Sequence, residues 1–307
     1  MKRLLHRIRG RIRADWARAS EVLALKSALM VRVARLGLVK LKFPLRKEFL
    51  VLQCSDGNDA SGLFSEFAAV LGMLAHYEKW NAIYAGVNVD FGTQGLYYDP
   101  SVGANWWQYY FEPIELGCSR NARIRMVSAE QHDELALRID RMPRRLGAEL
   151  IRRHVRVRAR VTEKVDAYAR EHFQGTHVIG IHYRGTDKNS DLPLVPYETV
   201  WAAVRAAIEA GNGRPYRIFV ATDEQAFLND MRRRVPAGLL YRESVRSTDG
   251  SPTHKKTGNN YAKGEDALVD CLLLARSDRL IRTASNLSLC AALFNPDLPQ
   301  IVLSTER

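Results

Sequence analysis

The sequence predicts an α/β protein whose second half is built on a parallel, doubly wound sheet. From residue 175 onward, short apolar runs alternate with amphipathic stretches, which is the pattern of strands joined by crossover helices. Polar residues gather directly after three of the apolar runs, at 182–188, 222–224 and 285–286. Because the carboxyl ends of parallel strands meet at one edge of a sheet, these three clusters are expected to line a common ligand site.

The first half opens with the same alternation. An apolar run at 49–53 is followed by a loop rich in Gly, Ser and Asp at 55–62, and then by apolar residues at helical spacing over 63–77. A strand, a turn and a helix in this order are typical of a nucleotide-binding unit, although the loop contains neither a Walker motif nor G-x-G-x-x-G. For each glycine taken singly, a purely structural turn is the stronger interpretation.

Residues 80–170 give less specific signals. Aromatic residues are dense between 80 and 120 and could stack on sugar faces, but for each of them a place in the hydrophobic core is favoured. The arginine-rich segment 120–170 has a helical composition and is expected to connect the two halves. The aromatic residues are Trp80, Tyr97, Tyr98, Trp106, Trp107, Tyr109, Tyr110 and Phe111.

The second half is expected to alternate strands and helices without a break. The polar stretch 242–260 is long for a loop in a compact domain, so we expect it to be mobile or to close over a ligand. The expected strands cover 177–183, 216–221, 238–241, 279–283 and 300–303, and the expected helices cover 197–210, 224–234, 264–276 and 286–294.

The positive charge of the protein is concentrated in an N-terminal arm. The chain has 46 Lys and Arg against 34 Asp and Glu, which gives a net charge of +12. Residues 1–50 hold 14 of the basic residues and only three acids, so the remainder is nearly neutral. Apolar residues of 1–42 lie near helical spacing with arginines between them, which predicts one or two basic helices. Such helices could lie on an anionic membrane, pack on the body or contact a partner, whereas nucleic acid is disfavoured because no nucleic-acid module follows.

The composition argues against several other classes of protein. A hydrophobic content of 46% and a charged content of 26% are typical of a globular protein. No uninterrupted apolar segment fits a secretory signal or a membrane span, because basic residues break the tract at 22–41. The cysteines are too widely spaced for a metal knuckle or a redox pair, which predicts a reducing compartment and no structural metal. They are Cys54, Cys118, Cys271 and Cys290.

The cluster at 182–188, H-Y-R-G-T-D-K, carries the most specific chemistry. Arg184 could grip a diphosphate, since a guanidinium matches phosphate oxygens bidentately, and Lys188 could add a point charge. A strand that runs into an exposed charged turn is the alternative for this cluster taken alone. The residues expected to join it at the same edge are His182, Thr222, Asp223, Ser285 and Asn286.

The same cluster resembles the H-x-R-R-T-D-K motif of the α1,6-fucosyltransferases. This family includes the bacterial nodulation fucosyltransferase and the animal core fucosyltransferase, within the protein O-fucosyltransferase superfamily. Residues 219–223, F-V-A-T-D, resemble its second motif, a strand that ends in A-T-D. The resemblance covers about 175–295, is fainter over 50–115 and is absent from the arm. Its third region is matched by Asp270, Asp278, Thr283 and Ser285.

The resemblance implies a GT-B-like glycosyltransferase with two Rossmann-type halves, mainly parallel sheets and GDP-fucose as donor. It implies that Arg184 binds the β-phosphate, that His182 and Asp223 hold the guanosine, and that Ser285 and the amides after it add phosphate contacts. The family works without a metal, so no cofactor is expected besides the donor substrate. The expected domains are the basic arm at 1–47, an acceptor-side domain with its helical connector at 48–170, and the donor-binding domain at 171–307.

Two departures from the family pattern bear on the chemistry. Gly185 stands where the family has its second Arg, so one phosphate contact is missing or comes from elsewhere. The carboxylate proposed as the base in the core fucosyltransferase falls at Leu192 here. An inverting transfer needs a base near the acceptor hydroxyl, or a dissociative transition state that does without one. Asp191 is the first candidate base and Asp187 the second, and either could be only a loop residue.

The leading hypothesis is therefore an inverting, metal-independent fucosyltransferase that acts on a bacterial glycan or glycolipid. A different nucleotide-sugar donor remains open, because Gly185 could remodel the pyrophosphate pocket. A non-catalytic scaffold of the same fold that binds a glycan or a nucleotide also remains open. We expect a cytoplasmic location, with peripheral contact to the inner face of the membrane through residues 1–47.

Overall fold

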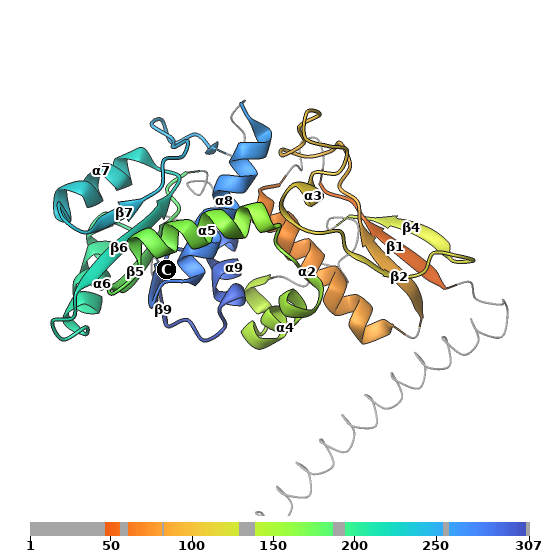
Figure 1. Cartoon of the computed structure of the whole chain (residues 1–307), viewed down its shortest axis with the longest axis horizontal. Helices are drawn as coiled ribbons and strands as arrows, with labels where there is room; N and C mark the ends of the chain where they lie inside the picture. Colours follow the sequence, from red (N-terminus) through yellow and green to blue (C-terminus); the bar gives the residue numbers. More distant parts are fainter. Residues whose placement is uncertain are drawn as a thin grey trace, which may run out of the picture. The chain divides into compact units, whose positions relative to one another are not determined.

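The structure is a computed structural model that describes residues 47–55, 61–81, 83–128, 139–186, 194–253 and 258–304. Residues 1–46 of the basic arm predicted at 1–47 lie outside the described residues. Residues 48–307 belong to one compact unit, and its helices and strands are drawn in Figure 1.

The N-terminal half contains a four-stranded sheet in the order β3-β2-β1-β4. Strand β1 (Glu48–Leu52) pairs in parallel with β2 (Tyr84–Val89) and with β4 (Arg123–Val127), and only β3 (Glu115–Gly117) is antiparallel. The predicted strand at 49–53 is thereby confirmed, and the half is a Rossmann-type unit as expected.

Strand β4 was not predicted, because residues 120–170 have a helical composition overall. That prediction is wrong for Arg123–Val127, where the sequence R-I-R-M-V alternates charged and apolar residues. The strand lies at the edge of its sheet, and Ile124 and Met126 are 60% and 47% exposed. An edge strand needs little burial, so its hydrophobic pattern is short and easily overlooked. The rest of the segment forms the helices α4 (Arg144–His154) and α5 (Ala159–His172).

Helix α2 (Leu63–Trp80) follows β1 as predicted and packs an aromatic core against α3 (Trp107–Tyr110). The ring of Phe67 stacks on Trp107 and also contacts Phe111. Trp106, Trp107, Tyr109, Tyr110 and Phe111 are all buried, so the alternative in which aromatics of this stretch line a sugar-binding groove is wrong for these five.

The C-terminal half contains a five-stranded, fully parallel sheet in the order β7-β6-β5-β8-β9. The chain builds outward from β5 in one direction and then crosses to the other side of β5 with β8. This is the predicted doubly wound topology, and its switch point lies between β5 and β8. The strands are β5 (His177–Tyr183), β6 (Tyr216–Thr222), β7 (Leu239–Tyr241), β8 (Arg279–Arg282) and β9 (Gln300–Val302).

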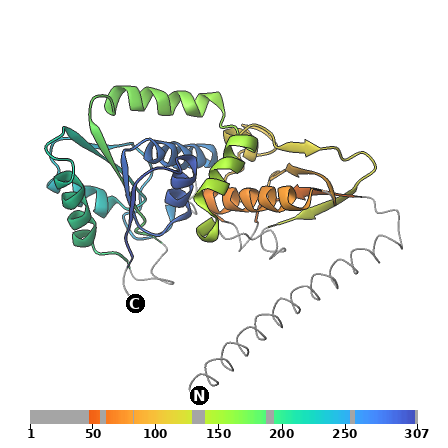
Figure 2. The same ribbon diagram turned by 90° about the horizontal axis from the view of Figure 1, so that it is seen from below.

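Helices cover both faces of this sheet (Figures 1 and 2). Helices α6 (Tyr197–Glu209) and α7 (Gln225–Arg234) bury one face, while α8 (Asn260–Ala275) and α9 (Asn286–Phe294) bury the other. Helix α8 begins four residues before the predicted 264, because the side chain of Asn259 caps it by accepting from the amide of Ala262 at 2.8 Å. The other boundaries of these four helices agree with prediction to within one residue, whereas α2 ends three residues after the predicted 77.

One hydrophobic core runs through both halves of the compact unit. It joins residues of β1 and α2 to residues of α4, α8 and α9, and the ring of Phe67 on α2 lies 5.7 Å from that of Phe294 on α9. The two sheets are therefore not independent globules joined by a linker.

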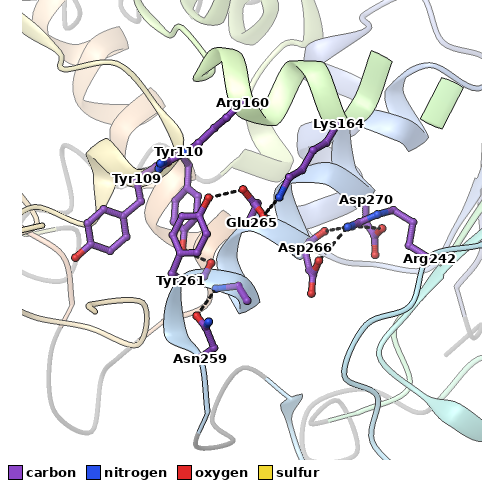
Figure 3. A network of polar contacts seen from close by, with 11 residues as sticks. Tyr109, Tyr110, Arg160, Lys164, Arg242, Asn259, Tyr261, Glu265, Asp266 and Asp270 are labelled. Atoms are coloured by element: carbon purple, nitrogen blue, oxygen red, sulfur yellow. Dashed lines mark hydrogen bonds and ion pairs between the residues drawn. The ribbon is translucent and has the colours of Figure 1, made fainter. Parts of the chain in front are cut away.

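A polar network at the start of α8 reinforces this union (Figure 3). The hydroxyl of Tyr110 donates to the carbonyl of Tyr261 at 2.9 Å, and a Cβ placed on Gly264 would lie 2.2 Å from that hydroxyl oxygen. Glu265 accepts from the Tyr261 hydroxyl and from Lys164 of α5. Glycine at 264 is thus what allows α3 and α8 to approach so closely.

The same network places one of the aspartates that resemble the third family region. Asp270 of α8 pairs with Arg242 at 3.3 Å, and Arg242 also binds Asp266 at 3.0 Å. Burial raises the pKa of Asp270 to about 6, although Arg242 opposes the shift. Asp270 therefore anchors the chain after β7 to α8. The polar stretch predicted at 242–260 is tied down at its start in this way, while residues 254–257 lie outside the described part.

Candidate functional site

The carboxyl ends of β5 and β8 are joined by hydrogen bonds at the switch point of the C-terminal sheet. The amide of Thr283 donates to the carbonyl of His182 at 3.1 Å, and the amide of Arg184 donates to Oγ1 of Thr283 at 3.0 Å. Strand ends beside a switch point leave backbone groups and side chains free to converge on a ligand. The sequence motif and the topology therefore indicate the same place.

Asp223, directly after β6, fixes the short loop that follows β5. Its Oδ1 accepts from the amide of Gly185 at 2.9 Å, and its Oδ2 accepts from the hydroxyl of Thr186. Oδ2 also lies 3.4 Å from Nε of Arg184. In this structure both oxygens of Asp223 thus serve the loop itself, which adds a positioning role to the guanosine contact expected from the resemblance.

Arg184 is held in a partly open position by these contacts. Its side chain is 25% exposed, and Asp223 orients its Nε edge. A guanidinium with a fixed orientation can bind a planar anionic group without losing further side-chain entropy. The predicted diphosphate-binding residue thus lies where a ligand at the sheet edge would meet it.

His182, the buried residue before the last of β5, is neutral in this environment. It is 4% exposed, and burial lowers its pKa to about 3, with Arg184 and Arg282 contributing in the same direction. Within the described part of the chain, its Nδ1 has no hydrogen-bond partner. A neutral imidazole can both donate and accept, which suits a polar ligand group better than an anion.

Helix α9 begins at the same edge with Ser285 as its N-cap and Asn286 as its first residue. Ser285 is extended, with φ −160° and ψ 144°, and its side chain makes no capping hydrogen bond. The first amides of a helix lack intrahelical partners and attract anions. Thr222 has a different place, because its Oγ1 accepts from the amide of Glu224 at 3.2 Å and it is buried. The structure therefore brings Ser285 and Asn286 to the site and gives Thr222 a structural hydrogen bond.

The N-terminal half reaches this site through the start of α2, which the sequence did not predict in detail. Nδ2 of Asn286 donates to Oγ of Ser65 at 3.1 Å, so the first turns of α9 and α2 meet. The hydroxyl of Tyr97 accepts from the amide of Leu63 at 2.8 Å. Burial raises the pKa of Tyr97 to about 12, against the influence of the Leu63 amide and of Arg184. Tyr97 therefore lies within electrostatic reach of Arg184.

Glu66 is the buried carboxylate on this side of the site. It lies in the first turn of α2, and its Oε1 accepts from the amide of Ser55 at 3.2 Å. A carboxylate in the first turn of a helix is stabilised by the helix dipole. Through its hydrogen bond with the Ser55 amide, Glu66 ties the chain just after β1 to the start of α2. The only sequence signal for Glu66 was its place in the turn after the Gly-rich loop.

Three predicted catalytic residues, Asp187, Lys188 and Asp191, lie outside the described residues. Their roles stay predictions. Among the described residues, no group of three or more His, Cys, Asp or Glu is arranged to hold a metal ion. Likewise, no helix in the described ranges has the length and apolar character required to cross a membrane.

A unit with two α/β halves and mainly parallel sheets has the GT-B-like architecture of glycosyltransferases. Solved structures share this fold. A NodZ α-1,6-fucosyltransferase soaked with GDP-fucose aligns with a TM-score of 0.55 at 18% identity, covering 81% of this chain and 94% of that one. A mutant of Arabidopsis thaliana FUT1 in complex with GDP aligns with a TM-score of 0.52 at 11% identity, covering 89% of this chain and 74% of that one.

The family model for nodulation protein Z (NodZ) matches residues 140–304, and the chain belongs to this family. Nodulation protein Z of Sinorhizobium fredii (strain NBRC 101917 / NGR234) is 29% identical over 136 residues, which is 42% of this chain and 42% of that protein. The Bradyrhizobium diazoefficiens protein is 28% identical over 138 residues, which is 42% of this chain and 37% of that protein. The match thus spans less than half the length of these curated relatives.

Proposed function

We propose that this protein is a fucosyltransferase that transfers fucose from GDP-fucose to a hydroxyl of a glycan or glycolipid. Membership of the NodZ family supports the reaction class. A solved relative of the same fold was soaked with GDP-fucose and another was co-crystallised with GDP, which supports this donor. The acceptor would approach from the 48–170 side, and residues 171–307 would bind the donor.

The observation that carries the proposal is the placement of Arg184 at the switch point. Thr283 holds its backbone, Asp223 orients its guanidinium, and α9 begins at Asn286, three residues after Thr283. A guanidinium and a helix N-terminus at one strand edge are suited to a diphosphate that gains charge as it leaves.

The proposed reaction proceeds with inversion. The acceptor oxygen attacks the anomeric carbon on the face opposite the diphosphate, and the electron pair of the breaking bond goes to the β-phosphate oxygen. Arg184 and the amides of α9 stabilise the negative charge on that oxygen. The acceptor proton passes to a carboxylate, for which Asp191 is the first candidate and Asp187 the second, while Lys188 adds positive charge beside the phosphates.

The proposed reaction is also independent of metal ions, because Arg184 and α9 supply the positive charge that a divalent cation would otherwise provide. Turnover is therefore expected to be unchanged in EDTA. Loss of activity in EDTA that added Mg²⁺ or Mn²⁺ restores would contradict this part of the proposal.

The test of the whole proposal is release of GDP from GDP-fucose by the wild type and by Arg184→Ala. We expect the variant to lose on the order of 10²- to 10³-fold in turnover, with an unchanged circular dichroism spectrum. Arg214→Ala, at an exposed arginine between α6 and β6, is the matched control and should retain full activity. Full turnover by Arg184→Ala would overturn the assignment. Thermal-shift titrations with GDP, UDP and CMP check the donor separately, and stabilisation by UDP but not by GDP would point to another nucleotide sugar.

We further propose that the protein is cytoplasmic and that residues 1–47 bring it to the inner face of the membrane. The excess of Lys and Arg in this arm supports attraction to anionic lipid. Removing residues 1–46 should abolish sedimentation with vesicles that contain phosphatidylglycerol and should spare activity on a soluble acceptor. Unchanged sedimentation of the truncated protein would exclude the arm as the membrane contact.

A further inference from the structure

The loop that directly follows β5 begins with residues 184–186 and is called the donor loop below. Glu224 fills the space that a side chain at position 185 of this loop would need. A Cβ placed on Gly185 would lie 2.0 Å from Oε2 of Glu224, 2.6 Å from its Cδ and 2.8 Å from its Cβ. These separations are far below van der Waals contact, and the last one involves an atom that a rotamer change does not move. No side chain can therefore be accommodated at 185 while Glu224 and the backbone stay in place.

Glu224 is held in this position by the elements around it. It is the N-cap residue of α7, its amide donates to Oγ1 of Thr222, and it pairs as an isolated bridge with Ser247. Burial raises the pKa of its carboxyl group, against the influence of the nearby Tyr197 hydroxyl. Its Oε2 is buried without a hydrogen-bond partner among the described residues. The carboxyl group therefore fills space beneath the loop and makes few polar contacts there.

The donor loop rests directly on this carboxyl group. Gly185 lies between Arg184, whose guanidinium faces Asp223, and Thr186, whose hydroxyl binds the same aspartate. A shift of the backbone at 185 would move both neighbours relative to Asp223. The packing of residue 185 against Glu224 thus determines the position of the Arg184 guanidinium.

We infer that Gly185 and Glu224 are a coupled pair that positions the donor loop, in which the Glu224 side chain fills the volume that a side chain at 185 would need. Glu224 is a positioning residue that acts through the loop backbone. The inference deepens the proposed function and rests on it where GDP binding is the readout.

The coupled pair predicts that an arginine introduced at position 185 weakens GDP binding, whereas its positive charge alone would strengthen it. An added guanidinium beside a diphosphate site should by itself strengthen GDP binding. In this protein Gly185→Arg, which restores the second arginine of the H-x-R-R-T-D-K motif, should instead weaken GDP binding about tenfold or more, because it displaces the loop. The double variant Gly185→Arg with Glu224→Gly should bind GDP at least as tightly as the wild type, because the space beside residue 185 is then open.

The experiment is a double-mutant cycle with Gly185→Ala, Glu224→Gly and the double variant, with GDP affinity measured by calorimetry and stability measured by urea unfolding. Glycine is tolerated at an N-cap, so Glu224→Gly should leave α7 intact. We expect each single variant to weaken GDP binding, and the double variant to lose at least about tenfold less than the product of the two single effects. Glu224→Gln, which keeps the volume, should bind GDP as the wild type does.

The controls are Gly103→Ala, whose new methyl group would meet its nearest neighbour at an ordinary 3.5 Å, and Glu209→Ala at an exposed position of α6. Neither should change GDP affinity or stability. Single effects that simply multiply in the double variant, or wild-type GDP affinity in Gly185→Arg, would overturn the inference. If the wild type binds no GDP, the proposed donor fails, and the unfolding free energies of the same four proteins still decide whether the pair is coupled.

Discussion

The side-chain amide of Asn286 donates to the hydroxyl of Ser65 at 3.1 Å, and this hydrogen bond joins the first turns of α9 and α2. The two helices pack against different sheets, and the bond brings their N-terminal turns together. Two partial positive charges that lie close together are unfavourable until an anion lies beside them. We therefore expect a phosphate group to be stabilising where the two halves meet.

Removal of this hydrogen bond should loosen the junction. Ser65→Ala is expected to lower the free energy of unfolding by about 1 kcal/mol, which is the usual worth of one neutral hydrogen bond. The substitution should also weaken GDP binding, because the first turns of α2 and α9 are no longer held together. Urea unfolding and calorimetry measure the two effects. Ser119→Ala, at an exposed serine, is the control, and equal stability of the two variants would contradict the expectation.

Replacing Asp223 by Asn should damage the donor loop more than its small change in size suggests. One of the two acceptor oxygens becomes an NH₂ group, which cannot accept from Gly185, Thr186 or Arg184. We expect GDP affinity to fall about tenfold or more, since hydrogen bonds to charged groups contribute about 1.5–3 kcal/mol. Asp297→Asn, at an exposed aspartate before β9, should leave the affinity unchanged. Wild-type affinity in Asp223→Asn would show that the loop does not depend on this carboxylate.

His182 should make the protein sensitive to acid. Burial lowers its pKa to about 3, whereas in the unfolded chain it is 6.5. Between these two values the unfolded chain binds a proton that the folded protein excludes. The stability contributed by His182 is therefore complete above pH 6.5 and is lost as the pH falls toward 3, by up to about 1.4 kcal/mol per pH unit.

The measurement is urea unfolding of the wild type and of His182→Gln between pH 7.5 and about 4. Burial raises the pKa of Asp270 to about 6, which has the opposite sign and stabilises the folded state as the pH falls below 6. Because Asp270 is present in both proteins, its effect cancels in the difference. The wild type should lose stability relative to the variant as the pH falls, and parallel curves would exclude a buried neutral His182.

Gly264→Ala should destabilise the protein even though alanine favours helices by about 1 kcal/mol over glycine. The new methyl group would lie 2.2 Å from the Tyr110 hydroxyl oxygen and 2.4 Å from the ring carbon beside it, so α3 and α8 would have to separate. We expect a net loss of about 1–3 kcal/mol in the free energy of unfolding. Gly103→Ala is the control, and a stabilised Gly264→Ala protein would show that the helices are not in close contact.

Local sequence patterns were sufficient to predict the C-terminal sheet. Each of its strands contains a short apolar run, the central strands β5 and β6 are buried over most of their length as parallel strands are, and polar residues mark the ends of β5, β6 and β8. The identity of Arg184 as a site residue followed from the same pattern, because a charged residue directly after a buried strand has only the sheet edge to occupy.

The contacts between the halves could not be predicted in this way. The partners Ser65 and Asn286 are 221 positions apart in the chain, and no local pattern relates them. The sequence likewise showed that residue 185 is glycine, but only the fold shows that Glu224 fills the space beside it. Strand β4 was missed for a different reason, since an exposed edge strand carries little of the hydrophobic signal that prediction relies on.

The hydrophobic core that continues from α2 into α9 has a consequence for how this enzyme class can diversify. The C-terminal half shares its interior with the N-terminal half, so exchange of one half for a foreign one would leave Phe67 or Phe294 without its neighbour. With the acceptor on the 48–170 side, as proposed, new acceptor preferences are expected to arise by change within surface loops of these residues, with the interior contacts between the halves kept intact. Chimeras between relatives should fold only when both halves of this interior are transferred together.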